Sequence, residues 1–325
     1  MDFSSIHTPV LLERCIELLA PAVDHDGAVL VDGTLGMGGH SEALLERFPR
    51  LRLIGIDRDS DALAIAGERL ARFGDRFTVV HAVYDEIGDV VREHARGGVD
   101  GILLDLGVSS LQLDRAERGF AYSKDAPLDM RMDTTTGVTA AEIIATWDES
   151  ELRRIFHEYG EERLAPRFAR KLVEARDRAP IERSSQLVEI IAAATPAALQ
   201  RTGHPAKRVF QALRIAVNGE LDALERALPD AIDALTLGGR IVVMSYQSLE
   251  DRLVKRELQR RSSSTTPPGL PIELPEHSPE LRLLVKGAGR ASDDEIAANP
   301  RATPVRLRAA ERIRATTTPA TRNGA

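Results

Sequence analysis

The stretch VDGTLGMGGHS, residues 31–41, decides the fold of this 325-residue chain. It continues the short apolar run Ala28–Asp32 and holds four glycines before a helical pattern starts at Ser41. A glycine-rich turn between a strand and a helix lets a ligand approach the backbone and offers free N–H groups at the start of the helix. The stretch therefore predicts a nucleotide-like ligand at the end of the first strand of an α/β sheet.

Five short runs rich in Val, Ile and Leu have the composition of buried parallel strands. They are Ala28–Asp32, Leu51–Asp57, Phe77–His81, Gly101–Leu106 and Arg240–Ser245. The helical patterns that separate the first four are Ser41–Phe48, Ser60–Phe73 and Tyr84–Ala95. Strand–helix alternation at this spacing predicts right-handed βαβ units and a doubly wound, Rossmann-like sheet.

More than 130 residues separate the fourth run from the fifth, far more than one crossover needs. Residues 114–205 contain four helical patterns and no convincing strand; the patterns are Ala140–Ala145, Glu149–Tyr159, Ala165–Arg178 and Ser185–Ala194. We therefore expect an all-helical substrate-recognition domain at 114–205, inserted into a discontinuous domain made of residues 1–113 and 206–325.

The remaining elements follow from spacing and composition. Apolar residues recur at helical spacing over Lys207–Leu237, which predicts one long helix returning the chain to the sheet. After the fifth run we expect a helix, an exposed loop, a further strand and a disordered tail; these are Leu249–Arg261, 262–280, Leu281–Lys286 and 315–325.

Composition and charge narrow the class of protein. Cys15 is the only cysteine, so an intrachain disulfide and a thiolate metal cluster are excluded, and we expect no metal. The N-terminus does not have the pattern of a signal peptide, and no apolar run approaches the roughly 20 residues that cross a bilayer. These features predict a soluble protein of the cytoplasm.

The net charge of −7 is unevenly distributed along the chain. Residues 1–149 carry 14 Lys and Arg against 27 Asp and Glu, whereas residues 150–214 carry 13 against 8 and residues 280–325 carry 9 against 5. Two basic segments thus flank an acidic body and are suited to form an RNA-binding face. Arginine-rich helices with solvated faces give the same pattern, and charge alone leaves both interpretations open.

Two features of the turn favour S-adenosylmethionine over a nicotinamide dinucleotide. The spacing Gly36-x-Gly38-Gly39 lacks the G-x-G-x-x-G frame that places a pyrophosphate on the helix. Asp32 precedes the turn, where a carboxylate repels a pyrophosphate but suits the ammonium of a methionine moiety. The glycine frame thus disfavours a NAD dehydrogenase.

Three further side chains stand at or just after the carboxyl ends of the next three strands. Asp57 is suited to accept both ribose hydroxyls of an adenosine, and the alternative role of helix N-cap is better filled by Asp59 or Ser60. Tyr84 either lies against adenine or belongs to the core, and Asp105 ends the fourth strand. Open α/β sheets bind ligands at this edge, so the coincidence indicates one site.

Longer segments resemble the ribosomal RNA small subunit methyltransferase H family, which methylates the N4 amine of a cytidine in the decoding region of 16S rRNA (the equivalent of C1402). The block PLDMRMD is highly specific to it. The matching segments are HTPVLLERC (7–15), DGTLGMGGHS (32–41), DGILLDLGVSS (100–110), QLDRAERGFAYSKDAPLDMRMD (112–133), YGEER (159–163), HPAKRVFQALRIAVNGEL (204–221), SYQSLEDRLVK (245–255) and ANPRA (298–302).

The resemblance implies a class I S-adenosylmethionine-dependent methyltransferase fold and a small-ribosomal-subunit substrate. It assigns cofactor contacts to Gly38, Gly39, His40, Asp57, Tyr84, Asp105 and Gln112. Three positions depart from the common pattern of the family: Leu111 replaces a frequent proline, Tyr84 a frequent phenylalanine, and Tyr246-Gln247 a frequent Phe-His. A glutamine cannot exchange a proton, so a histidine general base is not expected at Gln247.

Methyl transfer from a sulfonium depends mainly on in-line positioning, whereas a cytosine amine must be turned and polarised by hydrogen-bond acceptors. Asp105 is the first candidate for this catalytic role, with Ser109 and Asn218 as weaker ones; Ser109 and Ser110 equally suit a role in shaping the loop.

The cytidine would have to leave its base stack to reach the sulfonium. Basic residues suited to hold the RNA backbone are Arg153, Arg154, Arg167, Arg170, Lys171, Lys207 and Arg208.

Two other functions remain open from the residues. One is a methyltransferase that acts on DNA or a small amine. The other is a cofactor-binding ribosome assembly factor without turnover. The oligomeric state, monomer or homodimer, is also open.

Overall fold

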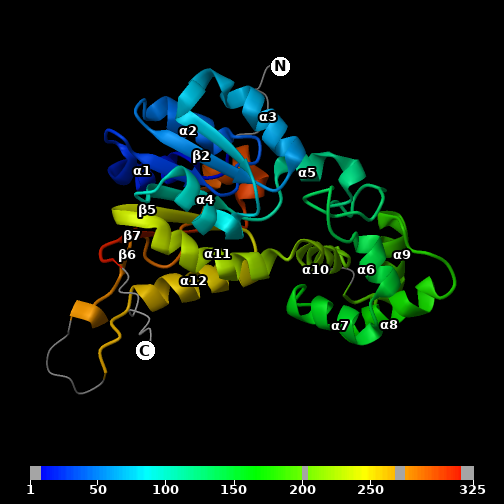
Figure 1. Ribbon diagram of the computed structural model, residues 1–325. Coiled ribbons are helices and arrows are strands. Elements are labelled where there is room, and N and C mark those ends of the chain that lie inside the picture. The colour runs from blue at the N-terminus through cyan, green and yellow to red at the C-terminus, as the bar shows by residue number, and fades with distance from the viewer. Residues whose placement is uncertain (1–8, 200–203, 268–274, 316–325) are drawn as a thin grey trace, which may run out of the picture. The chain divides into compact units, whose positions relative to one another are not determined.

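The computed structural model describes residues 9–199, 204–267 and 275–315 (Figure 1). Its internal contacts divide the chain into unit 1, residues 1–107 and 223–325, and unit 2, residues 108–222. Unit 2 is longer than the insertion predicted at 114–205, because Val108, Leu113 and the helix after residue 206 pack into its hydrophobic core.

Unit 1 is built on a seven-stranded sheet in the order β3-β2-β1-β4-β5-β7-β6. Strands β1 to β5 are parallel, and β7 pairs antiparallel with both β5 and β6. The strands are β1 (Val29–Asp32), β2 (Arg52–Asp57), β3 (Phe77–His81), β4 (Val99–Asp105), β5 (Leu235–Ser245), β6 (Leu281–Leu283) and β7 (Arg306–Arg312). The predicted doubly wound parallel sheet is therefore confirmed.

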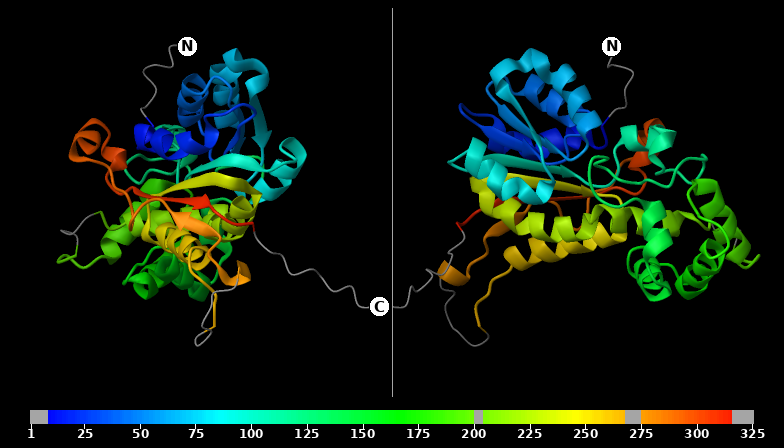
Figure 2. Two further views of the ribbon diagram at one scale, coloured as in Figure 1. Left: turned by 90° about the vertical axis from the view of Figure 1, so that its left-hand side faces the viewer. Right: turned by 45° about the vertical axis from the view of Figure 1, so that its right-hand side comes forward.

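Helices cover both faces of this sheet (Figures 1 and 2). Alternate residues of each central strand enter one of two hydrophobic clusters, as for Leu30 on one face and Val31 on the other. One cluster includes residues of α1 (Leu12–Val23), α2 (Gly39–Arg47) and α3 (Ser60–Leu70); the other includes residues of α4 (Ile87–His94), α11 (Glu220–Ala234) and α12 (Ser248–Arg261). Burial on both faces explains why the strands are continuous apolar runs.

Short elements complete unit 1. They are η2 (Ala71–Arg76), η3 (Tyr84–Glu86), η6 (Pro275–His277), α13 (Asp293–Ala298) and η7 (Pro300–Ala302). Of the predicted loop 262–280, residues 268–274 lie outside the described residues, as do residues 316–325 of the predicted tail.

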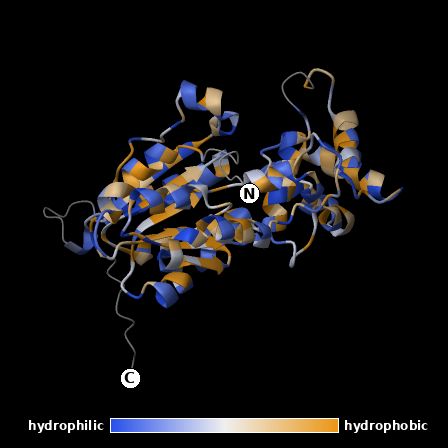
Figure 3. Ribbon diagram, turned by 90° about the horizontal axis from the view of Figure 1, so that it is seen from above, coloured by the Kyte–Doolittle hydropathy of each residue, from blue (hydrophilic) through white to orange (hydrophobic). Residues whose placement is uncertain are grey.

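Unit 2 is helical, and its described residues contain a single isolated β-bridge, Pro127 with Arg183. Its elements are α5 (Ser110–Asp114), η4 (Ala116–Arg118), α6 (Ala140–Thr146), α7 (Glu149–Glu158), α8 (Ala165–Arg176), α9 (Ser184–Ala194) and α10 (Lys207–Asn218). They share one hydrophobic core, which includes Phe156, Phe168 and Leu213. The helices carry both hydrophobic and hydrophilic residues, whereas the central strands of unit 1 are mostly hydrophobic (Figure 3).

The prediction of one long helix over Lys207–Leu237 is wrong. Helix α10 ends at Asn218, where Gly219 takes a left-handed conformation with φ of +58° and donates its N–H to the carbonyl of Ile215. Glycine adopts this helix-ending conformation without the steric cost that a side chain would impose. The second helix, α11, begins at Glu220, and residues from Leu235 onward already belong to β5.

No helix among the described residues combines the length and the apolar character that crossing a bilayer requires.

Candidate cofactor site

The turn between β1 and α2 follows the strand at which the order of the sheet reverses. The chain adds β2 and β3 on one side of β1, and then β4 and β5 on the other side. Open α/β sheets bind ligands at such a switch point. Gly36 and Gly38 have φ of +51° and +78°, in the left-handed region that favours glycine. A Cβ at Gly39 would lie 2.7 Å from Cγ of Pro9, so this position has no room for a side chain.

Asp32 ends β1 and is almost fully buried, with 2% of its surface exposed. Its carboxylate accepts hydrogen bonds from the hydroxyl of Ser41 at 2.7 Å and from the N–H of Thr34 at 3.2 Å. Burial nevertheless raises the pKa of Asp32 to about 6. A buried carboxylate of this kind favours a cationic ligand beside it, because a positive charge offsets the cost of ionisation.

Asp57 ends β2 and reaches back to the same turn. Its Oδ2 accepts from the N–H of Gly36 at 2.7 Å, and its Oδ1 accepts from the N–H of Asp59 at 2.9 Å. Burial raises the pKa of this carboxyl group. Asp59 caps α3 by accepting from the N–H of Asp61, so the N-cap role belongs to Asp59.

Asp105 ends β4 and has three polar neighbours, two of which hydrogen-bond to it. Its N–H donates to Oγ1 of Thr34 at 2.6 Å, and its Oδ1 accepts from the phenol of Tyr246 at 2.7 Å. Its Oδ2 lies 3.8 Å from Nδ1 of His40. The Asp105 side chain is 27% exposed, so it is accessible as well as constrained.

His40 belongs to the first turn of α2 and is buried. Its Nε2 lies 3.0 Å from the carbonyl of Val10, which fixes the proton of the ring on Nε2. Burial lowers the pKa of His40, so the ring is neutral near pH 7 and presents the lone pair of Nδ1 toward Asp105.

Tyr84 begins η3, directly after β3. Its Cβ lies 3.5 Å from the point that a Cβ on Gly33 would occupy, which places the residue beside the β1 turn. The side chain is partly buried and packs against one of the two hydrophobic clusters of unit 1.

The other predicted residues belong to unit 2. Gln112 and Ser109 form a capping box at the start of α5: the N–H of Ser109 donates to Oε1 of Gln112 at 3.0 Å, and the N–H of Gln112 lies 3.3 Å from Oγ of Ser109. These contacts shape the loop after β4, and the cofactor role of Gln112 and the catalytic role of Ser109 stay predictions.

Asn218 ends α10 and is 7% exposed. Its Oδ1 accepts from the N–H of Met132 at 2.7 Å, and its Nδ2 donates to the carbonyl of Met130 at 2.8 Å. The amide thus binds the backbone of the PLDMRMD block, where Met130 has the unusual φ of +62°. Whether Asn218 also acts in catalysis stays a prediction.

The structure brings together the predicted residues of unit 1 around the β1 turn; they are Gly38, Gly39, His40, Asp57, Tyr84 and Asp105. Two contact residues at this turn, Thr34 and Tyr246, were not predicted. Tyr246 directly follows β5, and its place at the carboxyl edge of the sheet is the signal from which the sequence could have identified it. In the described part of the chain, no group of three or more His, Cys, Asp or Glu side chains is arranged to hold a metal ion.

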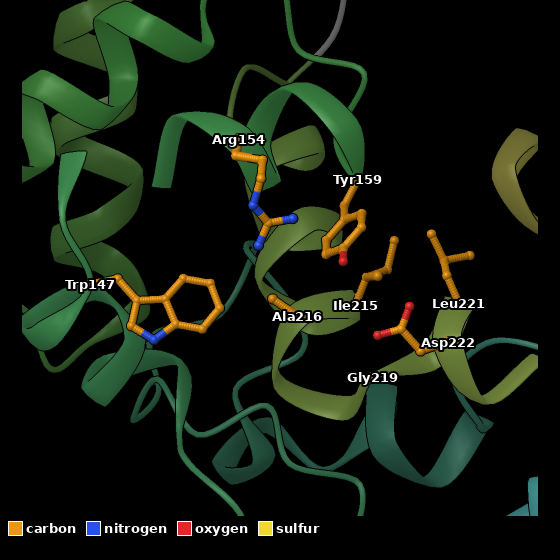
Figure 4. A pocket seen from close by; sticks show the side chains of 8 residues that line it. All are labelled: Trp147, Arg154, Tyr159, Ile215, Ala216, Gly219, Leu221 and Asp222. Atoms are coloured by element: carbon orange, nitrogen blue, oxygen red, sulfur yellow. The ribbon is translucent and has the colours of Figure 1, made fainter. Parts of the chain in front are cut away.

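A pocket of about 180 Å³ opens on unit 2. The side chain of Arg154 extends from α7 toward the gap that Trp147 and Tyr159 border (Figure 4). The guanidinium carbon of Arg154 lies 5.8 Å from the centroid of the Tyr159 ring, a cation–π distance. The full lining is Trp147, Arg154, Tyr159, Ile215, Ala216, Gly219, Leu221 and Asp222.

Comparison with known proteins identifies relatives that match nearly the whole chain. Proteins named Ribosomal RNA small subunit methyltransferase H are 68% identical in Clavibacter michiganensis subsp. michiganensis (strain NCPPB 382), over 97% of this chain and 99% of the relative, and 68% identical in Leifsonia xyli subsp. xyli (strain CTCB07), over 95% of each. A solved rRNA methylase from Streptococcus thermophilus is 12% identical, with a TM-score of 0.43 and coverage of 96% of this chain and 100% of that one.

The sequence pattern of the MraW methylase family matches residues 4–313. With the strand order of unit 1, this match confirms the predicted class I methyltransferase fold with a helical insertion. The chain belongs to the MraW methylase family.

Proposed function

We propose that this protein transfers a methyl group from S-adenosylmethionine to the N4 amine of a cytidine in the decoding region of 16S rRNA. The observation that carries the proposal is the set of carboxylates at the ends of β1, β2 and β4 around one glycine-rich turn, in a chain 68% identical to small-subunit rRNA methyltransferases. The substrate places the protein with ribosomes in the cytoplasm.

The residues of the turn fit S-adenosylmethionine. Asp32 is a buried carboxylate that a nearby ammonium would stabilise, and Asp57 stands at the end of β2, where adenosine hydroxyls are bound in sheets of this kind. We assign the cofactor to these two residues together with Gly38, Gly39, His40, Tyr84, Asp105 and Gln112. When bound, the cofactor supplies an electrophilic methyl group on a sulfonium.

The acceptor amine needs hydrogen-bond acceptors, because its lone pair is delocalised into the cytosine ring. Asp105 is the residue of unit 1 that we assign to this role, since it combines a fixed orientation with partial exposure. A carboxylate that orients the amine contributes to the transfer, because in-line positioning of the acceptor accounts for much of the rate in methyl transfer from a sulfonium.

The RNA contacts are assigned to unit 2. Of the seven basic residues that the sequence suggests for this role, six are exposed: Arg153, Arg154, Arg167, Arg170, Lys207 and Arg208. Of these, Arg154 pairs with Glu158 and Arg170 with Glu174, and the partly buried Lys171 also pairs with Glu174. Exposed cations suit phosphate contacts. The pocket beside Trp147 and Tyr159 adds partly exposed rings, which suit the stacking of unpaired bases.

The proposal is tested by incubating the protein with methyl-labelled S-adenosylmethionine and one of three substrates: isolated small ribosomal subunits, naked 16S rRNA or DNA. We expect label in N4-methylcytidine after nuclease digestion of RNA from small subunits that lack the modification. Labelling of DNA alone would contradict the proposal.

The assembly-factor alternative gives a different result in the same experiment. It predicts binding of S-adenosylmethionine and of small subunits with no transfer of label to any substrate. If an Asp105→Ala variant restores N4-methylcytidine in a strain that lacks this protein, Asp105 does not have the catalytic role.

A further inference from the structure

The segment SYQSLEDRLVK (245–255) contains the last residue of β5, the two-residue turn Tyr246-Gln247 and the first part of α12, and it is not used by the function proposed above. Tyr246, at the start of this turn, donates its phenolic O–H to Oδ1 of Asp105 at 2.7 Å. The phenol is largely withdrawn from water, and burial together with the charge of Asp105 raises the pKa of Tyr246 far above its ordinary value. The hydroxyl therefore stays protonated and acts only as a donor to the carboxylate.

The backbone of the turn is fixed by one buried carboxylate. Oε2 of Glu250, a residue that is 3% exposed, accepts from the N–H groups of Tyr246 at 2.9 Å and Gln247 at 3.2 Å. Its Oε1 accepts from Nε2 of Gln247 at 3.0 Å. Gln247 is thus part of the cap of α12.

The next acidic residue, Asp251, ties the same helix to the sheet. It is 5% exposed and its carboxylate pairs with Arg308 of β7 at 2.7 Å and with Arg306 at 3.2 Å. The start of α12 is therefore held both by its own cap and by β7. Because of these restraints, the position of the Tyr246 ring is determined by the fold of unit 1.

Asp105 gains a defined orientation from this contact. The side-chain χ2 torsion of an aspartate is intrinsically broad, so a carboxylate needs outside contacts to hold one orientation. The hydroxyl of Thr34 accepts from the N–H of Asp105 and fixes the backbone there, whereas Tyr246 holds the carboxylate itself. A hydrogen bond to an ionised acceptor is stronger than one between neutral groups.

We propose that Tyr246 is a positioning residue of this chain, whose hydroxyl holds the Asp105 carboxylate in the orientation that it uses for cofactor binding and methyl transfer, a contact that the phenylalanine frequent at this position in the family does not make. The inference rests on the proposed function, because it takes Asp105 as part of the cofactor and acceptor site. Tyr246 acts through Asp105 and is not itself assigned a contact with either substrate.

The test compares Tyr246→Phe, which removes only the hydroxyl, with wild type. We expect the affinity for S-adenosylmethionine, measured by calorimetry, or the kcat of methyl transfer to fall about tenfold, while the KM for RNA and the unfolding temperature stay unchanged. The matched control is Tyr122→Phe, which removes a hydroxyl from unit 2 and is expected to leave both values within twofold.

A double-mutant cycle with Asp105→Asn separates positioning from a general structural effect. If Tyr246 acts through Asp105, removing its hydroxyl in the Asp105→Asn background produces less than a threefold further loss. A loss below threefold in both affinity and kcat for Tyr246→Phe in the wild-type background overturns the inference. An equal loss in the two backgrounds overturns it as well.

Failure of the proposed function gives a different pattern of results. If wild type methylates no RNA, the proposed function fails, yet calorimetry with S-adenosylmethionine still reports whether Tyr246 supports Asp105. If wild type methylates RNA and Tyr246→Phe is unchanged by every measure, the inference about Tyr246 fails alone.

Discussion

Asp32 has its carboxyl group in an environment where a negative charge is costly. The pKa of about 6 lies above the ordinary value of 3.8, so the folded chain binds this proton more readily than the unfolded chain does. The resulting stabilisation is complete below about pH 4 and is lost as the pH rises past 6. A pKa shift of this size changes the free energy of unfolding by about 3 kcal/mol.

Asp32→Asn removes this titration. In the absence of cofactor, wild type loses about 3 kcal/mol of unfolding free energy between pH 4 and pH 7.5, and the variant does not. We therefore expect the unfolding free energy of the variant minus that of wild type to increase by this amount over the same range. Chemical denaturation at several pH values measures the difference, with Asp24→Asn, at an exposed residue, as the control. A difference that is constant with pH would contradict the assigned cause. The same variant is expected to bind S-adenosylmethionine more weakly.

At the residue scale, the sequence predicts side chains that stand at strand ends and misses those whose role depends on a distant partner. Asp32, Asp57 and Asp105 follow apolar runs, so their shared edge can be inferred from topology alone. The contact of Tyr246 with Asp105 joins residues 141 positions apart and required the order of strands β4 and β5 in the sheet.

At the element scale, Asn218 connects the end of α10 to the PLDMRMD block. In Asn218→Ala, the N–H of Met132 and the carbonyl of Met130 lose these hydrogen bonds in the interior of unit 2. We expect the unfolding free energy to fall by about 2–4 kcal/mol, as measured by denaturation. A large fall in kcat with stability unchanged would instead assign Asn218 to catalysis.

The pocket of unit 2 offers a direct optical probe. Trp147 is the only tryptophan of the chain and lines this pocket with Arg154 and Tyr159. We expect short single-stranded RNA to quench the fluorescence of Trp147, because a base entering the pocket stacks near the indole. Arg154→Ala should weaken this titration, whereas Arg50→Ala, at an exposed residue of unit 1, should not. Unchanged fluorescence at saturating RNA would place the RNA elsewhere.

Elements with strong periodicity were predicted, and those stabilised by polar pairing were not. The strand β7 has the sequence RLRAAER, in which Arg308 pairs with Asp251 and Glu311 with Arg240. Its charged residues are compensated by partners far along the chain, which a hydrophobic pattern does not reveal. The break between α10 and α11 depends on the backbone conformation of Gly219, whereas the apolar spacing continues across it.

At the scale of the whole molecule, charge determines how RNA affinity responds to salt. Arg167→Gln with Lys207→Gln removes two exposed cations from unit 2. We expect the slope of log affinity against log salt to decrease by about 1–2, because fewer counterions are released on binding. The control, Arg92→Gln with Arg96→Gln, neutralises two exposed cations of unit 1 near the amino end of β4. Equal slopes for the two variants would show that the exposed cations of unit 2 do not form the RNA-binding face.

The discontinuity of unit 1 also has a consequence for synthesis. Strand β4 ends at Asp105, and its partner β5 begins only at Leu235, after all of unit 2. At about 5–20 residues per second, the ribosome needs roughly 7–26 s to make the intervening segment. During this interval β4 has an unpaired edge, and the apolar side chains of Ile102 and Leu104 lack their neighbours from α11, β5 and α12. Translation therefore exposes a transient surface that a chaperone can bind, and slowing elongation within residues 108–222 prolongs that exposure.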